Sequence, residues 1–247
     1  MRPLNRRTVL RAAALGGLAT AVPAAPASAT TSLLRADRPS LTHGVQSGDV
    51  LPGSGLVWTR ADRPSRMVVD VADNPEFRRA RRIRGPLLTP DTDGTGKVRV
   101  PGRGTVHYRV TAEDLDGRTA SEPLTGSFRT PPRNKEGARF VWSGDIAGQG
   151  WGINPDLGGM TIFSAMADRD PDFFLCSGDT VYADGPLAET VTLPDGRVWR
   201  NVVTPEKLKV AETLAEFRGQ FAYNLLDENL RALAARVPQI NQWDDHE

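Results

Sequence analysis

The chain has 247 residues, which is room for one large domain or two ordinary ones, and its composition (39% hydrophobic, 25% charged) is that of a globular protein. Its 31 Lys and Arg residues are matched by 30 Asp and Glu residues, so no basic excess points to nucleic acid as a partner. The single cysteine, Cys176, excludes an intramolecular disulfide framework.

Residues 1–29 have the features of an export signal. A basic start that includes Arg6 and Arg7 is followed by a short, weakly apolar run and an A-x-A cleavage site at 27–29. The adjacent arginines favour the twin-arginine pathway, and an ordinary secretory signal is the alternative. We therefore expect a protein secreted outside the cytoplasmic membrane, with the twin-arginine machinery as a partner. We expect no stable membrane anchor, because no other stretch is apolar enough to span a bilayer.

Residues 38–131 are predicted to form a small β-sandwich of immunoglobulin or fibronectin type. Short segments of alternating polar and apolar residues are separated by clusters rich in Pro, Gly and Asp, and no convincing helix interrupts them. These segments are 55–60, 66–72, 96–100, 105–114 and 124–130. Five arginines at 78–84 could form a phosphate-binding patch, but the acidic residues nearby favour a solvated face on an edge strand.

A Pro-rich and charged linker at 130–138 leads to a second predicted domain, residues 138–247. Its pattern of strand, helix and strand is typical of a layered α/β domain with parallel strands. The predicted elements are strands at 139–145 and 171–179 with a helix at 158–170 between them, one or two helices at 204–237, and a third buried strand at 238–243.

Each of these strands ends in acidic residues: Asp145, Asp179 and the run Asp-Asp-His-Glu at 244–247. Ligands of open α/β sheets bind at the carboxyl ends of the strands. Carboxylates gathered there would repel one another unless a cation neutralised them. A pair of metal ions would do so, and would also activate water for displacement at phosphorus. The alternative is that Asp145, Asp179 and Asp245 cap helices.

The chain after the signal resembles the alkaline phosphatase D branch of the calcineurin-like metallophosphoesterases. The resemblance is carried by DFFLCSGDTVYADGP (172–186), FRGQFAYNLLDENLRAL (217–233) and VPQINQWDDHE (237–247), and SGDIAGQGWGINPDLGG (143–159) is similar to one of its subgroups. It implies an α+β fold, in which the β-sandwich is followed by an αββα metallophosphoesterase domain. Members of this branch run well past Asp-Asp-His-Glu, so we expect a domain that is incomplete at its C-terminus.

The resemblance also implies roles for individual residues. Asp145 matches the first metal-binding loop, and Asp179 matches a carboxylate that bridges two metals and is part of the catalytic centre. Tyr182 matches a phenolate ligand that favours ferric iron. Asp245 matches a ligand of the second metal, and His246 matches the catalytic histidine that hydrogen-bonds the substrate phosphate or the leaving-group oxygen.

The implied cofactors are two or more metal ions, Fe³⁺ and Ca²⁺. Some members of the branch have a cysteine ligand in the first loop, where this chain has Ser143-Gly144-Asp145. Cys176 lies three residues before Asp179, so we expect its side chain to point away from the metals, and the identity of the metals stays open. Asp244 and Glu247 are expected to support the ligands.

The implied function is that of a secreted alkaline phosphatase, which uses a metal-bound hydroxide to hydrolyse phosphate monoesters. Hydrolysis of phosphate diesters is left open. A phosphate ester would be the substrate and the protein would be a monomer without nucleic acid as a structural partner. Three alternatives stay open: a phosphodiesterase or phospholipase D-like enzyme, a nucleotidase on the same fold, and an inactive remnant that acts as a binding module. We expect little or no activity from the 247 residues alone.

Overall fold

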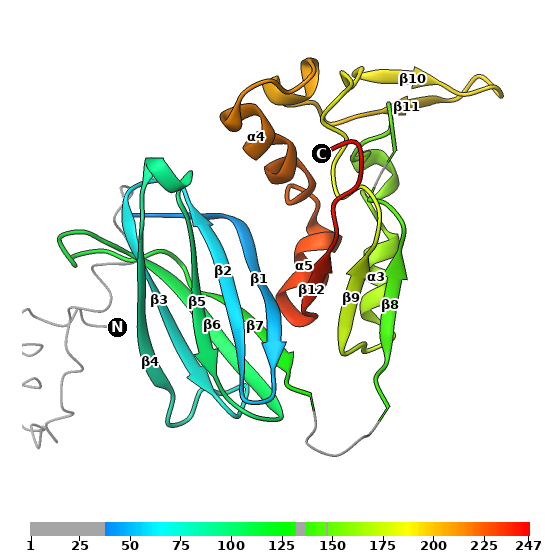
Figure 1. Cartoon of the computed structure of the whole chain (residues 1–247). Coiled ribbons are helices and arrows are strands. Elements are labelled where there is room, and N and C mark those ends of the chain that lie inside the picture. The colour runs from blue at the N-terminus through cyan, green and yellow to red at the C-terminus, as the bar shows by residue number, and fades with distance from the viewer. Residues whose placement is uncertain (1–37, 132–136, 147) are drawn as a thin grey trace, which may run out of the picture. The chain divides into compact units, whose positions relative to one another are not determined.

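The computed structural model describes residues 38–131, 137–146 and 148–247 (Figure 1). The predicted export signal, residues 1–29, lies outside the described residues. Among the residues that the structure describes, no helix has the length and apolar character needed to cross a membrane.

The N-terminal half contains seven strands that pack as two layers around one core (Figure 1). One layer is an antiparallel sheet with the order β4-β3-β6-β7, and the other is formed by β5, β2 and β1. The strands are β1 (Leu41–Leu51), β2 (Ser54–Ala61), β3 (Ser65–Ala72), β4 (Arg81–Leu88), β5 (Thr95–Pro101), β6 (Thr105–Asp114) and β7 (Leu124–Arg129), and a 3-10 helix, η1 (Pro90–Thr92), precedes β5. The five predicted segments coincide with β2, β3, β5, β6 and β7, whereas β1 and β4 were not predicted.

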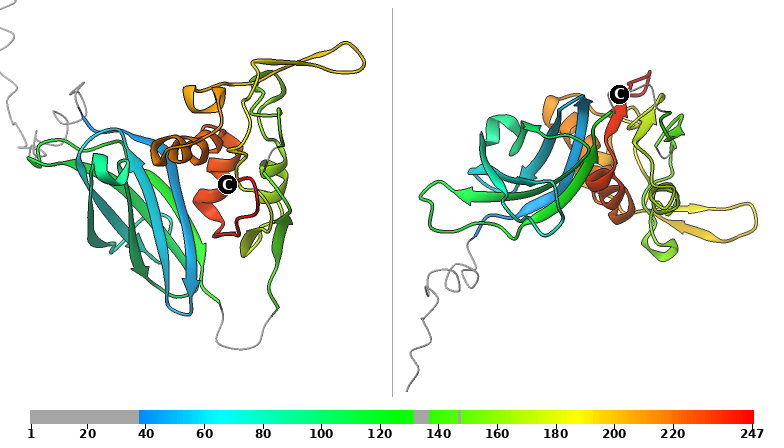
Figure 2. Two further views of the ribbon diagram at one scale, coloured as in Figure 1. Left: turned by 45° about the horizontal axis from the view of Figure 1, so that its top comes forward. Right: turned by 90° about the horizontal axis from the view of Figure 1, so that it is seen from below.

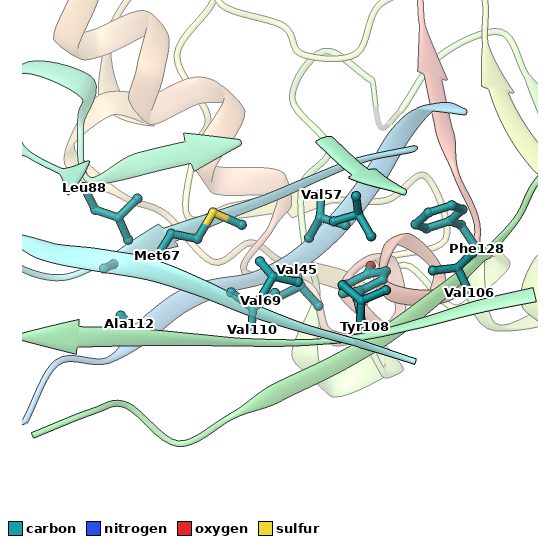
Figure 3. Close-up of a cluster of buried hydrophobic side chains, with 13 residues drawn as sticks. Val45, Val57, Met67, Val69, Leu88, Val106, Tyr108, Val110, Ala112 and Phe128 are labelled. Carbon is teal, nitrogen blue, oxygen red and sulfur yellow. The ribbon is translucent and has the colours of Figure 1, made fainter. Parts of the chain in front are cut away.

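The core of this half follows from the alternation of side chains along the strands. Along β2 every second residue is buried, and β6 shows the same period. Figure 3 shows how Val57, Met67, Tyr108 and Phe128 meet between the two layers, where each is at most 1% exposed. The buried Tyr108 hydroxyl donates a hydrogen bond to the main-chain oxygen of Ala235, 2.9 Å away. A buried phenol needs such a partner, so this contact fastens the core to the C-terminal half.

The arginine cluster lies on and just before β4, which is the edge strand of the four-stranded sheet. Arg81, Arg82 and Arg84 are exposed, and Arg82 forms ion pairs with Asp70 and Glu113. The prediction of a solvated edge-strand face is therefore confirmed. Cationic side chains on an unpaired edge also oppose pairing with other chains.

Three parallel strands extend the β5-β2-β1 layer into a six-stranded mixed sheet with the order β5-β2-β1-β12-β9-β8. They are β8 (Phe140–Ser143), β9 (Phe173–Cys176) and β12 (Gln239–Asn241). Within this sheet, the two parts are joined by one parallel pairing, Gly48 with Gln239. The other elements are η2 (Pro155–Leu157), α3 (Ile162–Ala167), the hairpin strands β10 (Thr190–Thr192) and β11 (Val198–Arg200), η3 (Pro205–Leu208), α4 (Leu214–Asn224) and α5 (Glu228–Arg236) (Figure 2).

The segment predicted as one or two helices, 204–237, forms η3 and two α-helices. Thr213 caps α4 and makes a reciprocal capping box with Glu216. Asp227 caps α5, because its carboxylate accepts a hydrogen bond from the main chain of Leu230 at 2.9 Å. The helices are therefore separate units, each with its own N-terminal signal.

Helices α3 and α5 cover one face of the parallel strands, where Phe163, Phe174 and Leu233 are buried together. The opposite face is open within the described residues: Phe140 is 52% exposed, Ile240 47%. The prediction that 238–243 is a buried strand is therefore wrong, because alternate side chains point to a face that no described element covers. The second sheet that an αββα domain requires is not among the described residues.

Candidate metal centre

The three parallel strands end in one row of the sheet. Ser143 pairs with Cys176, and Cys176 pairs with Asn241, so each strand has its last residue at the same level. At the carboxyl ends of all three strands the chain leaves the sheet, and each time an acidic side chain follows within a few residues. These acidic residues are Asp145, Asp179 and Asp245. The register alone therefore brings together carboxylates that are up to 100 positions apart in the sequence.

Hydrogen bonds fix the three loops against one another. The main-chain N–H of Ile146 donates to the main-chain oxygen of Asp179 at 2.8 Å, and the main-chain N–H of Asp179 donates to Oδ1 of Asp145 at 3.1 Å. The N–H of His246 donates to Oδ1 of Asp179 at 3.0 Å. A Cβ on Gly178 would collide with the Asp145 carboxylate and with the main chain of Gly144, so only glycine allows this close approach.

Asp179, Asp245 and His246 form a group that could hold a metal ion, because one ligand atom of each lies within 4.8 Å of the others. Tyr182 joins them: its hydroxyl donates to Oδ2 of Asp145 at 3.1 Å, and its ring centroid is 4.7 Å from that of His246. The structure thus brings all five predicted site residues together. Their individual roles stay predictions.

The electrostatics of this group favour a bound cation. Asp179 is 5% exposed, and its burial raises the pKa of the carboxyl, with Glu247 and Asp245 adding to the effect. Burial and the neighbouring Asp145 also raise the pKa of Tyr182. In the described part of the chain, no Lys or Arg forms an ion pair with these carboxylates. Carboxylate and phenol oxygens and an imidazole nitrogen are suitable metal ligands, so the residues fit a metal ion without specifying which one.

His246 has a partner that the sequence did not reveal. Its Nδ1 lies 2.6 Å from Oδ2 of Asp184, and Nε2 of Gln149 is 3.3 Å from the same nitrogen. The hydrogen bond with Asp184 raises the pKa of the imidazole. The other ring nitrogen of His246, Nε2, lies on the side of Asp245, 3.9 Å from its Oδ1. The only signal for Asp184 was its place two residues after Tyr182, on the same side of an extended segment.

Glu247 connects two of the loops. Its carboxylate accepts hydrogen bonds from the main chain of Thr180 at 2.6 Å and of Asp244 at 2.8 Å. From the other side, the Asn224 amide at the end of α4 donates to the oxygen of Thr180 at 2.6 Å. Glu247 therefore holds the loops in place, which agrees with its expected supporting role.

Cys176 lies beneath the loops in the apolar core. Its Sγ is 3.7 Å from the main-chain oxygens of Gly144 and Gly178, and burial raises the pKa of the thiol. It does not belong to the group of Asp179, Asp245 and His246. The capping alternative receives no support, because the α-helices of the described region have Thr161, Thr213 and Asp227 at their N-caps.

Comparison with known proteins identifies relatives of both halves of the chain. The family model of the PhoD-like phosphatases matches residues 140–247, and that of the PhoD-like phosphatase N-terminal domain matches residues 26–132. Alkaline phosphatase D of Bacillus subtilis (strain 168) is 27% identical over a 223-residue alignment, and the match covers 83% of this chain and 35% of that protein. A solved structure described as the structure of PhoD matches with a TM-score of 0.67 and 24% identity, over 86% of this chain and 40% of that one.

The chain thus spans between a third and a half of the length of these two relatives. The two family models follow one another along the chain, and the structural likeness supports the same fold. The resemblance predicted from the strand-end motifs is confirmed: the chain belongs to the PhoD-like phosphatases and carries their N-terminal domain.

Proposed function

We propose that the protein is a metal-dependent phosphoric ester hydrolase of the alkaline phosphatase type that acts on phosphate monoesters. One observation carries the proposal: Asp145, Asp179, Tyr182, Asp245 and His246 converge at the edge where three parallel strands end in one row. The similarity to alkaline phosphatase D supports it. The family's αββα architecture and the domain bounds 38–131 and 138–247 are part of the same proposal.

The proposed ligands are Asp145, Asp179, Tyr182 and Asp245, with Asp179 shared between two ions because it is the most buried carboxylate of the group. Two or more metal ions, proposed as Fe³⁺ and Ca²⁺, would neutralise phosphoryl oxygens and lower the pKa of water. The register of the three parallel strands brings the carboxylates together, and the hydrogen bonds between the loops hold them in place.

His246 is proposed to act on the substrate. Asp184 binds Nδ1, so the imidazole has a fixed orientation and Nε2 is directed at the carboxylate group. From there Nε2–H would donate a hydrogen bond to a phosphoryl or leaving-group oxygen and stabilise the charge that grows on it in the transition state.

The test is elemental analysis of the purified protein together with turnover of p-nitrophenyl phosphate and bis-p-nitrophenyl phosphate. The proposal expects stoichiometric metal and, in a chain that contains the complete site, faster hydrolysis of the monoester, with loss of both after chelation. Faster hydrolysis of the diester would instead favour the phosphodiesterase alternative. Absence of bound metal from the folded protein, even after iron and calcium are supplied, would contradict the proposal.

We also propose export by the twin-arginine pathway, which the residues before the cleavage site support. Replacing both Arg6 and Arg7 with Lys should abolish secretion and leave a folded precursor in the cytoplasm. Cell fractionation and immunoblotting would measure this, and normal secretion of the double variant would point to the general secretory pathway. Size-exclusion chromatography with light scattering would test the expected monomer.

A further inference from the structure

A cavity of about 240 Å³ lies beside the candidate metal centre. Tyr182 and Asp184 belong to its lining and contact the metal-centre residues Asp145 and His246, so the two sites are adjacent. Trp151 and Leu187 supply apolar walls. The volume is below the range of pockets for drug-sized ligands, which makes the cavity suitable for a small organic group.

Lys207 lines this cavity and is 7% exposed. Its Nζ donates hydrogen bonds to the main-chain oxygen of Tyr182 at 3.0 Å and to Oε1 of Gln220 at 2.6 Å, and it lies 5.2 Å from the centroid of the Tyr223 ring. All these partners are neutral. An ammonium group has three donors, so two hydrogen bonds leave one donor to satisfy.

The charge of Lys207 is therefore poorly compensated. Asp184 is the acidic residue of the cavity lining, and it forms no ion pair with Lys207. Asp184 is itself engaged by His246 at 2.6 Å. A buried cation without a counter-charge is unfavourable, and a structural tie to Tyr182 and Gln220 does not require a full positive charge.

We propose that this cavity is a subsite for an oxyanion, and that Lys207 binds a carboxylate or a second phosphate on the alcohol portion of the phosphate ester. This inference rests on the proposed function, because the ester phosphate would occupy the adjacent metal centre. Lys207 contacts the main chain of Tyr182 while the hydroxyl of the same residue contacts Asp145, so a ligand that spans both sites needs a short, rigid alcohol portion.

The kinetic test compares three aryl esters that differ in the para substituent: phenyl phosphate, 4-carboxyphenyl phosphate and 1,4-phenylene bisphosphate. Lys207→Gln keeps a donor for Tyr182 but removes the charge. We expect it to raise KM for the two acidic esters about tenfold or more beyond whatever change it causes in the KM for phenyl phosphate. The acidic ester whose KM rises more in Lys207→Gln shows whether the subsite prefers a carboxylate or a phosphate. Lys209→Gln is the matched control, because Lys209 is exposed and paired with Glu212 and Glu216.

A binding measurement separates this inference from the proposed function. Isothermal titration calorimetry of the chelator-treated full chain with 4-hydroxybenzoate and with phenol needs no turnover. Because the chelator has removed the metal, the carboxylate of 4-hydroxybenzoate cannot bind at the metal centre through a metal ion. We expect 4-hydroxybenzoate to bind about tenfold more tightly than phenol, and Lys207→Gln to remove the difference.

If no ester is hydrolysed but the binding difference is present, the phosphatase proposal fails and the subsite stands. Equal binding of the two ligands by the wild-type chain overturns the subsite, and this comparison holds even if Lys207→Gln does not fold. Equal effects of Lys207→Gln on all three esters overturn it as well, and would make Lys207 a purely structural residue.

Discussion

Two buried aspartates, one in each half of the molecule, have opposite surroundings. Asp70 on β3 is 7% exposed and receives hydrogen bonds from Arg82 at 2.8 Å and Arg109 at 3.0 Å. The hydrogen bond from Arg82 lowers the pKa of Asp70 most, and the hydrogen bond from Arg109 lowers it further. Asp179 is 5% exposed, and its burial raises the pKa of the carboxyl, to which the neighbouring Glu247 and Asp245 add.

The difference separates a carboxylate that serves the fold from one that opposes it. The two arginines compensate the cost of burying Asp70 with charge-assisted hydrogen bonds. The Asp179 site gathers negative charge that no described Lys or Arg neutralises, which is unfavourable for folding alone and is typical of functional sites.

The largest effect is expected at Asp179. Asp179→Asn should lower metal affinity more than about a hundredfold, because even residues that only support metal ligands contribute ten- to a hundredfold. Phosphatase activity should disappear with the metal. Titration with iron and calcium, followed by elemental analysis, measures the affinity.

Asp70→Asn is the matched control, with the same substitution at the same degree of burial. It should bind metal like the wild-type chain while its folding is weakened. If Asp179→Asn kept stoichiometric metal and full turnover, Asp179 would not be a bridging ligand and the contrast would lose its functional meaning.

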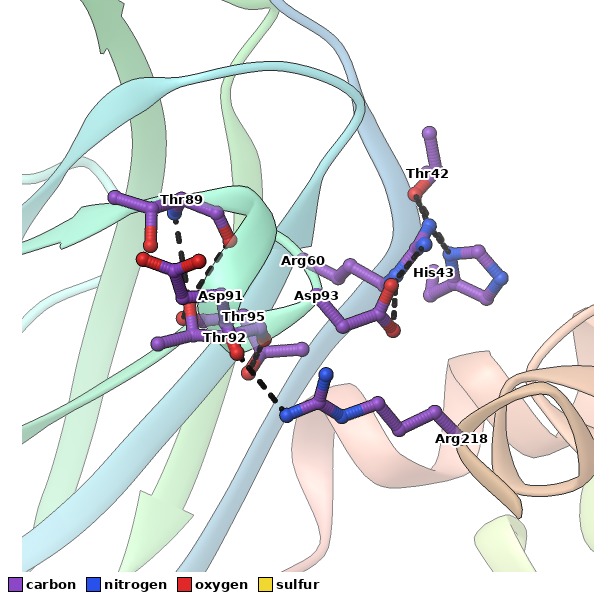
Figure 4. A network of polar contacts seen from close by, with 9 residues as sticks. All are labelled: Thr42, His43, Arg60, Thr89, Asp91, Thr92, Asp93, Thr95 and Arg218. Carbon is purple, nitrogen blue, oxygen red and sulfur yellow. Dashed lines mark hydrogen bonds and ion pairs between the residues drawn. The ribbon is translucent and has the colours of Figure 1, made fainter. Parts of the chain in front are cut away.

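The two halves also differ in their histidines. Figure 4 shows His43 of the sandwich, whose Nδ1 lies 2.6 Å from Oγ1 of Thr42 next to the Arg60–Asp93 ion pair. Burial lowers the pKa of His43, whereas Asp184 raises that of His246. His246→Ala should retain metal but lose turnover by roughly a hundred- to a thousandfold, as for the loss of one transition-state donor.

His43→Ala serves as the control and should leave kcat unchanged, since the hydrogen bonds of His43 remain within the sandwich. Steady-state kinetics and metal content are needed for both variants. Loss of metal from His246→Ala would identify His246 as a ligand instead, in line with its proximity to Asp179 and Asp245.

A smaller effect concerns stability and its pH dependence. Asp70→Asn should lower the free energy of unfolding by about 1–2 kcal/mol at pH 7, because Arg82 is largely exposed and its hydrogen bond is screened. Asp70 has a lowered pKa in the folded state, so its contribution is present above the ordinary value of 3.8 and is lost as the pH falls below it. Urea unfolding of both proteins at pH 7 and pH 3 should show the difference shrinking; a constant difference would exclude the ion pairs as its source.

The smallest effect is expected for Arg82→Gln. The side chain is 61% exposed and Arg109 remains paired with Asp70, so the loss should be about 0.5 kcal/mol or less. The same unfolding experiment measures it, with Arg84→Gln on the same edge strand as the control. A loss as large as that of Asp70→Asn would show that Arg82 alone balances the aspartate.

Much of the sandwich was predictable because its strands alternate between a buried and an exposed face. β1 was missed because glycines and polar residues interrupt its pattern, as at Gly44, Gln46 and Gly48, and because one of its two partner strands, β12, comes from a distant part of the chain. β4 was missed because its arginines conceal the alternation. In both cases pairing with neighbouring strands determines the structure more strongly than local pattern does.

The candidate centre was predictable as far as sheet topology determines it. Parallel strands place their ends at one edge, so Asp145, Asp179 and Asp245 were expected to meet. The contact of Asp184 with His246 and the burial of Lys207 depend on how the segment between β9 and α4 folds, which has no periodic pattern. Such loops carry function because a rigid sheet positions their ends.

The pairing of Gly48 with Gln239 has a consequence for synthesis of the protein. The two residues are 191 positions apart, and at usual translation rates roughly 10–40 s pass between them. During this time the side of β1 that later binds β12 has no partner strand on the ribosome. An unpaired edge invites contact with other nascent chains, and the charge of Asp49 together with the glycines of β1 makes it a poor template for such pairing.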